Sequence, residues 1–442
     1  MPPDATSGST ADTDSLLRPV AVRGERVYVI DEEGNRYLDA AGGGGVVTIG
    51  HGVRSVADAV GTALRELPFV HGGVFDTPQS LELAAMLSGS FPGPEQDADV
   101  IFTSGGSEAT EVAIATARRY WAAKGEPARQ TVLGRWHGYH GGTAAAQTLS
   151  GNRAPRQAYA ATEVPLAAPC YCYRCPFDVE FPFCEVACAH DLEETIRRAG
   201  PETVAAFICE PIVGETSGAV PPPTYLKTIR DICDTHGILF IADETLTGGG
   251  RTGQFFAIEH WDVVPDMLIV GGGLASGYAP LGALLVSEKV SEEASGADEP
   301  LEPTFTYQAH PPSVAAGLAV QQYLERHELI ARAPERGEYL TDHLAPLNRI
   351  ARVGEIRGQG LLRTIELVAD KSKRTPIPPE SLFVERLFEK LRHDGVIVHA
   401  VRGTIDGTAG EHLMLAPPFV ITEAEIDRPV HALEDALRST SM

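Results

Sequence analysis

The chain has 442 residues, 43% of them hydrophobic, which is enough to bury a large core and more than one domain. Its formal net charge of −24 is spread along the sequence, which argues against nucleic-acid and anionic-membrane partners, because these are bound through basic patches. No apolar run approaches membrane-spanning length, and the odd number of seven cysteines favours reduced thiols in the cytoplasm over a disulfide framework.

We do not expect the first residues to form a targeting signal. Residues 1–15, MPPDATSGSTADTDS, lack the basic start and the apolar stretch of a signal peptide, so we expect a disordered tail there. We expect residues 16–60 to pack with a C-terminal small domain, residues 61–311 to form a large domain, and the helix-rich residues 312–442 to form the small α/β domain.

Short apolar runs that end in polar or glycine residues alternate with segments of helical period, which is typical of parallel β/α units. The clearest runs are residues 100–104, 203–208, 237–243 and 267–271. Between two of them, residues 223–237 place Leu226, Ile229, Ile232 and Cys233 on one helical stripe and end at Gly237, a natural helix C-cap. The pattern predicts an α/β fold with a mostly parallel sheet flanked by helices.

Ligands of such sheets bind beyond the carboxyl ends of the strands. We therefore expect residues 104–107, Glu210, Asp243 and residues 271–273 to converge on one crevice. In TSGGSEATE, Gly106 and Ser107 stand where a strand turns into a helix, so they form either a phosphate cradle or an ordinary helix cap.

Two further motifs leave alternatives open at this stage. In GYHGGT, Tyr139 and His140 lie between glycines, so the aromatic ring either stacks on a planar ligand or packs inside the fold. Asp243 closes an apolar strand and needs a partner, which could be a metal, a helix start or a protonated heterocyclic nitrogen.

Through these motifs the chain resembles the class III (omega-type) aminotransferases, which use pyridoxal phosphate on fold type I. The resemblance runs from RGERVYVIDEEGNRYLDA through SGGSEATE, YHGGT and FTYQAHPPSVAAG to LMLAPPFVITEAEID. It implies a large cofactor-binding domain, a smaller α/β domain and a homodimer with a shared active site that acts on an amine or carbonyl substrate.

The resemblance also implies residue roles. Gly106 and Ser107 would bind the cofactor phosphate, and Thr306 would reach the phosphate in the neighbouring subunit. Tyr139 would stack on the pyridine ring beside His140. Asp243 would pair with the ring nitrogen and keep it protonated, which makes the ring an electron sink, and Glu210 would lie near the ring's substituents.

The sequence departs from the family on one side of this site. In DMLIVGGGL, Gly272 stands where the family has the lysine that covalently anchors the cofactor and shuttles protons. Thr245 and Gly249 replace a usual valine and phenylalanine, and Thr110 replaces a usual asparagine. The six lysines all lie outside the motifs: Lys124, Lys227, Lys289, Lys371, Lys373 and Lys390.

Loss of the lysine leaves three hypotheses. The first is an enzyme that binds pyridoxal or pyridoxamine phosphate without a covalent bond and runs altered or impaired transamination. The second is a catalytically silent subunit that completes the site of a lysine-bearing paralogue. The third is a lysine-independent enzyme whose pocket takes another ligand.

A cysteine-rich stretch, CYCYRCPFDVEFPFCEVAC, offers a separate feature. The spacing of Cys172, Cys175, Cys184 and Cys188 fits either a zinc or iron–sulfur site or a set of reduced structural thiols. Both readings remain open from the sequence.

Overall fold

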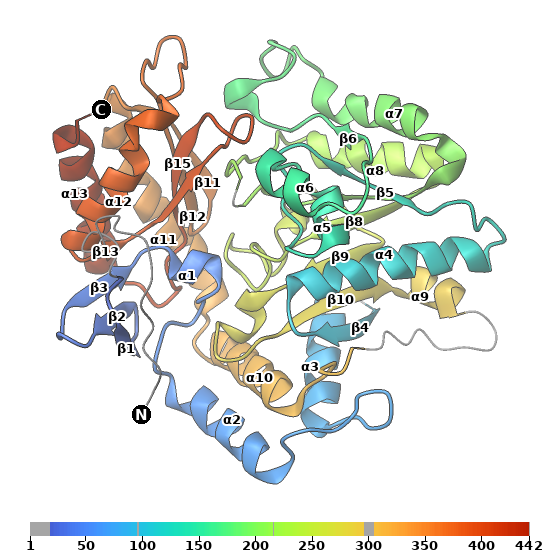
Figure 1. The fold of residues 1–442 in the computed structure, drawn as a ribbon. Coiled ribbons are helices and arrows are strands. Elements are labelled where there is room, and N and C mark those ends of the chain that lie inside the picture. The colour runs from blue at the N-terminus through green and yellow to red at the C-terminus, as the bar shows by residue number, and fades with distance from the viewer. Residues whose placement is uncertain (1–17, 95–96, 215, 296–304, 442) are drawn as a thin grey trace, which may run out of the picture.

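The computed structural model describes residues 18–94, 97–214, 216–295 and 305–441 (Figure 1). The expected tail at residues 1–15 lies outside the described residues. A seven-stranded sheet forms the centre, with strand order β4-β10-β9-β8-β7-β5-β6. Strands β5 to β9 run parallel along their pairings, and β10 is antiparallel to both of its neighbours. The predicted α/β class with a mostly parallel sheet is confirmed.

The strands of the central sheet are β4 (Ala98–Thr103), β5 (Thr131–Arg135), β6 (Leu166–Ala167), β7 (Val204–Cys209), β8 (Leu239–Asp243), β9 (Met267–Val270) and β10 (Gly282–Ser287). Each of the four predicted runs overlaps one of these strands, namely β4, β7, β8 or β9. β7, β8 and β9 are buried along their whole length, as expected for strands with helices on both faces.

Helices cover both faces of this sheet. One face packs against α4 (Gly106–Ala123) and α9 (Glu288–Ser295). The other packs against α3 (Pro78–Ser88), α7 (Ala187–Ala199), α8 (Tyr225–His236) and α10 (Pro311–Arg326). The crossover helix is α8: its predicted stripe is buried, and it ends at Gly237 with φ +60°, a left-handed backbone that favours glycine.

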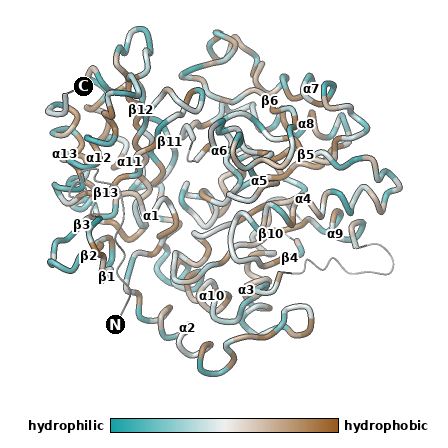
Figure 2. The backbone as a smooth tube through the Cα atoms, viewed as in Figure 1, coloured by the Kyte–Doolittle hydropathy of each residue, from teal (hydrophilic) through white to brown (hydrophobic). Residues whose placement is uncertain are grey.

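The remaining helices are α1 (Gly42–Gly45), α2 (Arg54–Glu66), α5 (Ala144–Leu149), α6 (Arg153–Tyr159), α11 (Leu329–Leu344), α12 (Phe383–His393) and α13 (Glu423–Ser439). Hydrophobic and hydrophilic stretches alternate along the outer helices (Figure 2), as one-sided burial requires. Within the described ranges, the structure contains no helix with the length and apolar character of a membrane span.

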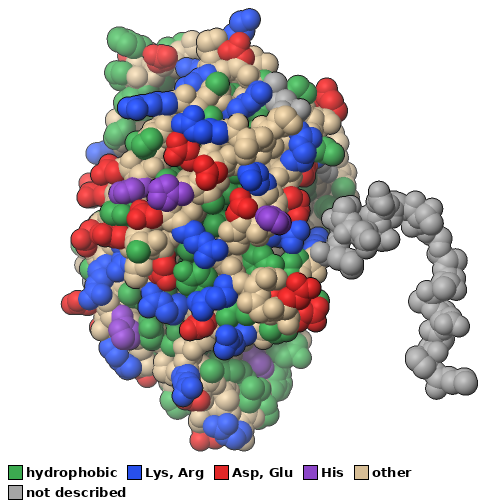
Figure 3. Space-filling model, turned by 90° about the vertical axis from the view of Figure 1, so that its left-hand side faces the viewer, with side chains coloured by type: hydrophobic (Ala, Val, Ile, Leu, Met, Phe, Trp, Pro, Cys, Tyr) green, Lys and Arg blue, Asp and Glu red, His purple; other side chains and the backbone are tan. Residues whose placement is uncertain are grey.

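Two smaller sheets lie beside the central one. The first is antiparallel and joins β11 (Val353–Gln359), β12 (Leu362–Leu367), β15 (Glu411–Leu415) and β14 (His399–Arg402) in that order. The second joins β1 (Ala21–Glu25), β2 (Tyr28–Asp31) and β3 (Arg36–Asp39) to β13 (Val396–Ile397) from the C-terminal part. Figure 3 shows basic and acidic side chains interspersed over the face that these elements occupy.

A buried arginine connects distant parts of the chain. Arg251 is fully buried, and burial lowers the pKa of its guanidinium to about 10. Its Nη1 donates to the carbonyls of Ala416 and Pro417, at 2.8 and 3.2 Å, and its Nη2 donates to those of Gly45 and Val47, at 2.8 and 3.5 Å. One side chain thus holds the N-terminal glycine segment, a turn of the central unit and the C-terminal part together.

We predict that Arg251→Met lowers the free energy of unfolding by about 3 kcal/mol or more, because several buried carbonyls lose a charged donor and keep no partner. Chemical denaturation followed by circular dichroism measures this. Arg332→Met is the matched control, since Arg332 is half-exposed and makes one surface ion pair; its effect should stay within about 0.5 kcal/mol. Equal effects of the two substitutions would contradict the prediction.

Candidate active site

A cavity of about 400 Å³ opens at the carboxyl ends of the central strands. We call it the strand-end cavity. It is lined by Gly44, Gly45, Val46, Gly106, Ser107, Tyr139, His140, Gly141, Glu210, Gly214, Asp243, Thr245, Leu246, Gly272, His399 and Met414. Residues that follow β4, β5, β7, β8 and β9 therefore meet, as the strand pattern predicted.

One side of the cavity is the turn from β4 into α4. The first N–H groups of a helix have no acceptor within it, so Gly106 and Ser107 present backbone donors at this edge. The Ser107 hydroxyl accepts the Gly142 N–H at 3.0 Å. A Cβ on Gly141, whose φ is +127°, would come within 2.5 Å of that hydroxyl, so only glycine fits there. Glycine at this point lets the two loops approach closely enough to form a cradle for an anion.

The floor of the cavity holds a carboxylate and an imidazole. Asp243, the last residue of β8, is buried, and its Oδ2 lies 2.7 Å from Nδ1 of the buried His140. A carboxylate only accepts, so His140 Nδ1 carries the proton. Oδ1 of Asp243 accepts the Thr245 N–H at 3.0 Å. The carboxylate is thereby fixed in orientation and keeps lone pairs for a further donor.

Glu210 forms the wall beside this pair. Its Oε1 accepts the Tyr139 N–H at 3.0 Å and its Oε2 accepts the Gly214 N–H at 2.7 Å. Burial raises the pKa of Glu210 to about 7, against the opposing effect of His140. The Tyr139 side chain is 38% exposed, so its ring lies at the cavity rather than in the core. The loop after β5 is thus held by a carboxyl that titrates near neutral pH.

Gly272 lines the cavity at the start of a short 3-10 turn that follows β9. A Cβ at this position would come within 3.3 Å of two methyl groups of Val46. At Gly271 it would come within 2.4 Å of the Thr245 methyl, and at Gly106 within 3.0 Å of that side chain. Val46 and Thr245 therefore occupy the space that glycines leave open.

None of the described residues that line the strand-end cavity is a lysine. Five of the six lysines are exposed, and Lys390, on α12, is half-buried. The cavity lining of the described chain also contains no arginine. Its polar groups are backbone N–H donors, hydroxyls, two carboxyls and two histidines.

Two other predicted residues lie elsewhere. Thr306 sits in an exposed turn and does not line the cavity of its own chain, and Gly249 adopts φ +83° in a buried turn away from the cavity. Conversely, sequence reasoning missed Val46, His399 and Met414. The run GGGG at residues 42–45 was a usable signal for the segment before Val46, whereas nothing in β14 or β15 marks His399 or Met414.

The cysteine-rich stretch does not form the metal site that its spacing allowed. Within the described ranges, no three His, Cys, Asp or Glu side chains are placed to hold a metal ion. The thiol of Cys170, which was outside the expected ligand set, instead hydrogen-bonds to Cys172 and Cys188. That bond lowers the pKa of Cys172 to about 7. Because no such ligand set is found among the described residues, the zinc or iron–sulfur interpretation has no support, and all seven cysteines are free thiols.

The central sheet with helices on both faces, and a cavity at its strand ends, is the architecture of the fold type I pyridoxal-phosphate transaminases. An amine transaminase from an uncultivated Pseudomonas species, in its PLP-bound form, superposes with a TM-score of 0.89 and 35% identity over 98% of both chains. An (S)-enantioselective omega-transaminase from Thermomicrobium roseum gives a TM-score of 0.88 and 36% identity over 98% of this chain and 95% of that one.

The family model for class III aminotransferases matches residues 10–437, and the chain belongs to this family. Among its relatives, the uncharacterized aminotransferase YodT of Bacillus subtilis is 35% identical over 96% of both chains. The putrescine–pyruvate aminotransferase of Pseudomonas aeruginosa is 34% identical over 96% of this chain and 91% of the relative.

The pKa of Glu210 gives a prediction about stability. Its folded-state pKa of about 7 exceeds its ordinary value of 4.5, so its contribution to stability is full below pH 4.5 and is lost as pH rises through about 7. The melting temperature of Glu210→Gln minus that of the wild type should therefore increase from pH 5 to pH 8 in differential scanning fluorimetry.

The difference in melting temperature between the variant and the wild type isolates the titration of Glu210. Glu244 and Glu411, whose pKa values burial also raises to about 7, titrate in both proteins and cancel in the difference. A glutamine amide nitrogen facing one of the two N–H donors adds only an offset that does not depend on pH. A difference that stays constant between pH 5 and pH 8 would show that Glu210 does not titrate in this range.

Proposed function

We propose that this chain binds pyridoxal or pyridoxamine phosphate in the strand-end cavity without a covalent bond, and acts there on an amine or carbonyl substrate. The observation that carries the proposal is the lining itself: the Asp243–His140 pair, Tyr139 and the Gly106–Ser107 cradle share one cavity with Gly272 and with no lysine. We therefore assign Gly272 to the position that the anchoring lysine occupies in the family.

The residues present fit this cofactor. Backbone donors at Gly106 and Ser107 suit a phosphate, the exposed ring of Tyr139 suits the face of a pyridine, and Asp243 suits a protonated ring nitrogen. The cavity volume of about 400 Å³ falls in the range of roughly 300–1,000 Å³ that small-molecule sites occupy. Pyridoxal phosphate, when bound, supplies the electron sink for chemistry at the carbon that bears the amine.

The chain's own groups then have separate tasks. Asp243, oriented by His140 and Thr245, holds positive charge on a ring nitrogen. Glu210, with a pKa of about 7, is the buried carboxyl suited to holding or moving a proton at neutral pH. Gly272 offers neither an anchor nor a proton carrier, so we expect ordinary transamination to be slower by at least ~10³-fold.

The proposal includes a homodimer. Thr306 is exposed and outside the cavity of its own chain, and we assign it to the phosphate in the partner's cavity. The names of the relatives, which mention putrescine with pyruvate and amines in general, favour an amine donor and a small oxo acid as the substrates.

Calorimetric titration with pyridoxal and pyridoxamine phosphates should show micromolar binding, about −8 kcal/mol, with one ligand per chain. Light scattering of the same sample should give twice the chain mass of 47.1 kDa. Asp243→Asn should weaken binding at least tenfold because the ring nitrogen loses its counter-charge, whereas Asp262→Asn, an exposed aspartate elsewhere, should not.

Other outcomes favour the other hypotheses. An absence of heat and of thermal shift at millimolar ligand would point to a pocket reassigned to another molecule. A monomer that reaches dimer mass only with a lysine-bearing paralogue would support a silent subunit.

Borohydride reduction of the protein loaded with pyridoxal phosphate should leave no cofactor attached, because reduction traps only a bond to a protein amine and none of the described residues that line the cavity is a lysine. Gly272→Lys should restore attachment in part, and Val46→Ala combined with Gly272→Lys should restore more, since the Val46 methyls crowd a Cβ at 3.3 Å. Peptide mass spectrometry locates the modification.

The six native lysines are internal controls in the same digest. A cofactor on any of them in the wild-type protein would show that the assignment of Gly272 is wrong. If neither Gly272→Lys nor the double variant with Val46→Ala carries the cofactor after reduction, the cavity does not bind this cofactor.

A further inference from the structure

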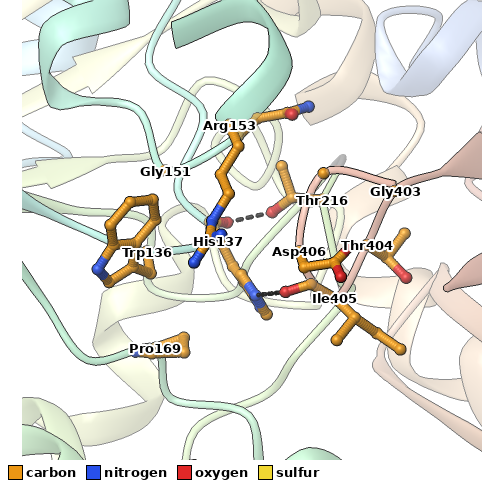
Figure 4. A pocket seen from close by; sticks show the side chains of 12 residues that line it. Trp136, His137, Gly151, Arg153, Pro169, Thr216, Gly403, Thr404, Ile405 and Asp406 are labelled. Carbon is orange, nitrogen blue, oxygen red and sulfur yellow. Dashed lines mark hydrogen bonds between the residues drawn. The ribbon is translucent and has the colours of Figure 1, made fainter. Parts of the chain in front are cut away.

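A second cavity, of about 190 Å³, lies where the segment after β5 meets the loop between β14 and β15. We call it the seam cavity. Its lining includes Trp136, His137, Arg153, Thr216 and the loop of residues 403–407 (Figure 4), and it shares no residue with the strand-end cavity. Its volume is below the roughly 300–1,000 Å³ of sites for drug-sized ligands, so its occupant is a small molecule.

One wall of the seam cavity carries a guanidinium that forms no ion pair with a carboxylate of the described residues. Arg153 lies over the indole of Trp136, with its Cζ 5.2 Å from the ring centroid. Figure 4 shows its side chain running down between Trp136 and His137. Among the ion pairs within 4 Å formed by the described residues, none includes Arg153. An arginine whose guanidinium lies over an aromatic ring still has N–H donors for bidentate binding of a carboxylate.

The opposite wall carries a fixed negative charge. Oδ1 of Asp406 accepts the N–H groups of Thr408 and Ala409, at 2.9 and 2.8 Å, and these bonds lower the pKa of Asp406. Arg153 acts electrostatically on this carboxyl, yet the two do not come within 4 Å as an ion pair. Oδ2 makes no hydrogen bond within the part of the chain that the structure describes. The cavity therefore presents a separated positive and negative charge.

The base of the seam cavity is neutral. His137, with φ +66°, places Nε2 at 2.9 Å from the carbonyl of Ile405 across the seam. Since a carbonyl only accepts, Nε2 carries the proton, and burial lowers the pKa of the ring, so the imidazole is uncharged at neutral pH. Thr216 donates to the His137 carbonyl. Arg153 and Asp406 are thus the charged side chains of the described lining.

We propose that the seam cavity binds a small α-amino acid as its zwitterion. The carboxylate pairs with Arg153, the ammonium pairs with Asp406, and a short side chain lies against Pro169 and Ile405, which also line the cavity. This site is additional to the proposed cofactor site and does not require it. The lining segments continue into the strand-end cavity at Tyr139, Gly214 and His399, so an amino acid held here contacts three segments that also shape that cavity.

The test is calorimetric titration of L-alanine into protein saturated with pyridoxine 5′-phosphate, which has the ring and phosphate but no aldehyde to react with an amine. We expect one site per chain with Kd of about 1 mM. Arg153→Gln should weaken alanine binding at least tenfold. Arg36→Gln is the matched control and should not, because Arg36 is likewise stacked on an aromatic ring, that of Tyr28 at 4.5 Å, but lies on β3.

A second variant separates the two charges. In Asp406→Asn the amide oxygen can keep both loop hydrogen bonds, because Oδ1 alone makes them. This substitution should raise the Kd of alanine at least tenfold. The Kd of propionate, which lacks the ammonium, should stay within twofold of its wild-type value. Unchanged alanine binding in Arg153→Gln, loss of that binding when pyridoxine 5′-phosphate is added, or no saturable binding up to about 100 mM, a hundredfold above the expected Kd, would each overturn the proposal.

The experiment distinguishes a failure of the amino-acid site from a failure of the proposed cofactor site. If pyridoxine 5′-phosphate does not bind, the cofactor proposal is wrong, and the alanine titration of the ligand-free protein with the same variants still decides the seam cavity.

Discussion

The shape of the protein depends on the guanidinium of Arg251. Four hydrogen bonds from the two terminal nitrogens of one fully buried side chain hold carbonyls from the N-terminal glycine segment and from the C-terminal part. The same side chain lies over the ring of Phe419, 5.2 Å from its centroid. A buried cation is tolerated because each carbonyl offers a partial negative charge at hydrogen-bonding distance. These bonds tie Gly45 and Val47, and the Val46 between them, to the C-terminal part of the chain.

Glycine determines how closely the other walls of the strand-end cavity approach. Gly45 has φ +87°, and a Cβ there would come within 2.1 Å of Leu246. Gly271 leaves space for the Thr245 methyl, and Gly272 leaves space for Val46. Among the described residues that line it, the cavity has no lysine or arginine, so its backbone N–H groups are the donors suited to an anion. The seam cavity differs, since it carries one stacked arginine and one fixed carboxylate.

Much of the fold and part of the site followed from local patterns. The strands at β4, β7, β8 and β9 and the helix α8 were predicted to within a few residues, because burial on both faces requires continuous apolar runs and one-sided burial requires a helical stripe. Strand ends then place Gly106, Glu210, Asp243 and Gly272 together. The cysteine spacing could not decide between a metal site and reduced thiols, because metal binding needs its ligands in one geometry, which spacing along the chain does not establish.

The sequence by itself determined the α/β class, the residues at the strand ends, and the absence of a lysine near them, since these depend on neighbours a few positions away. Only the tertiary structure decided that Val46, His399 and Met414 complete the strand-end cavity, that Cys170 pairs with Cys172 and Cys188, and that Arg153 faces Asp406 across the seam. Most of these contacts join residues that are from about twenty to several hundred positions apart in the sequence. The contact between Cys170 and Cys172 depends instead on how the two side chains are placed. Local propensity carries no information about them, because it is the packing of whole sheets and helices that brings such residues into contact.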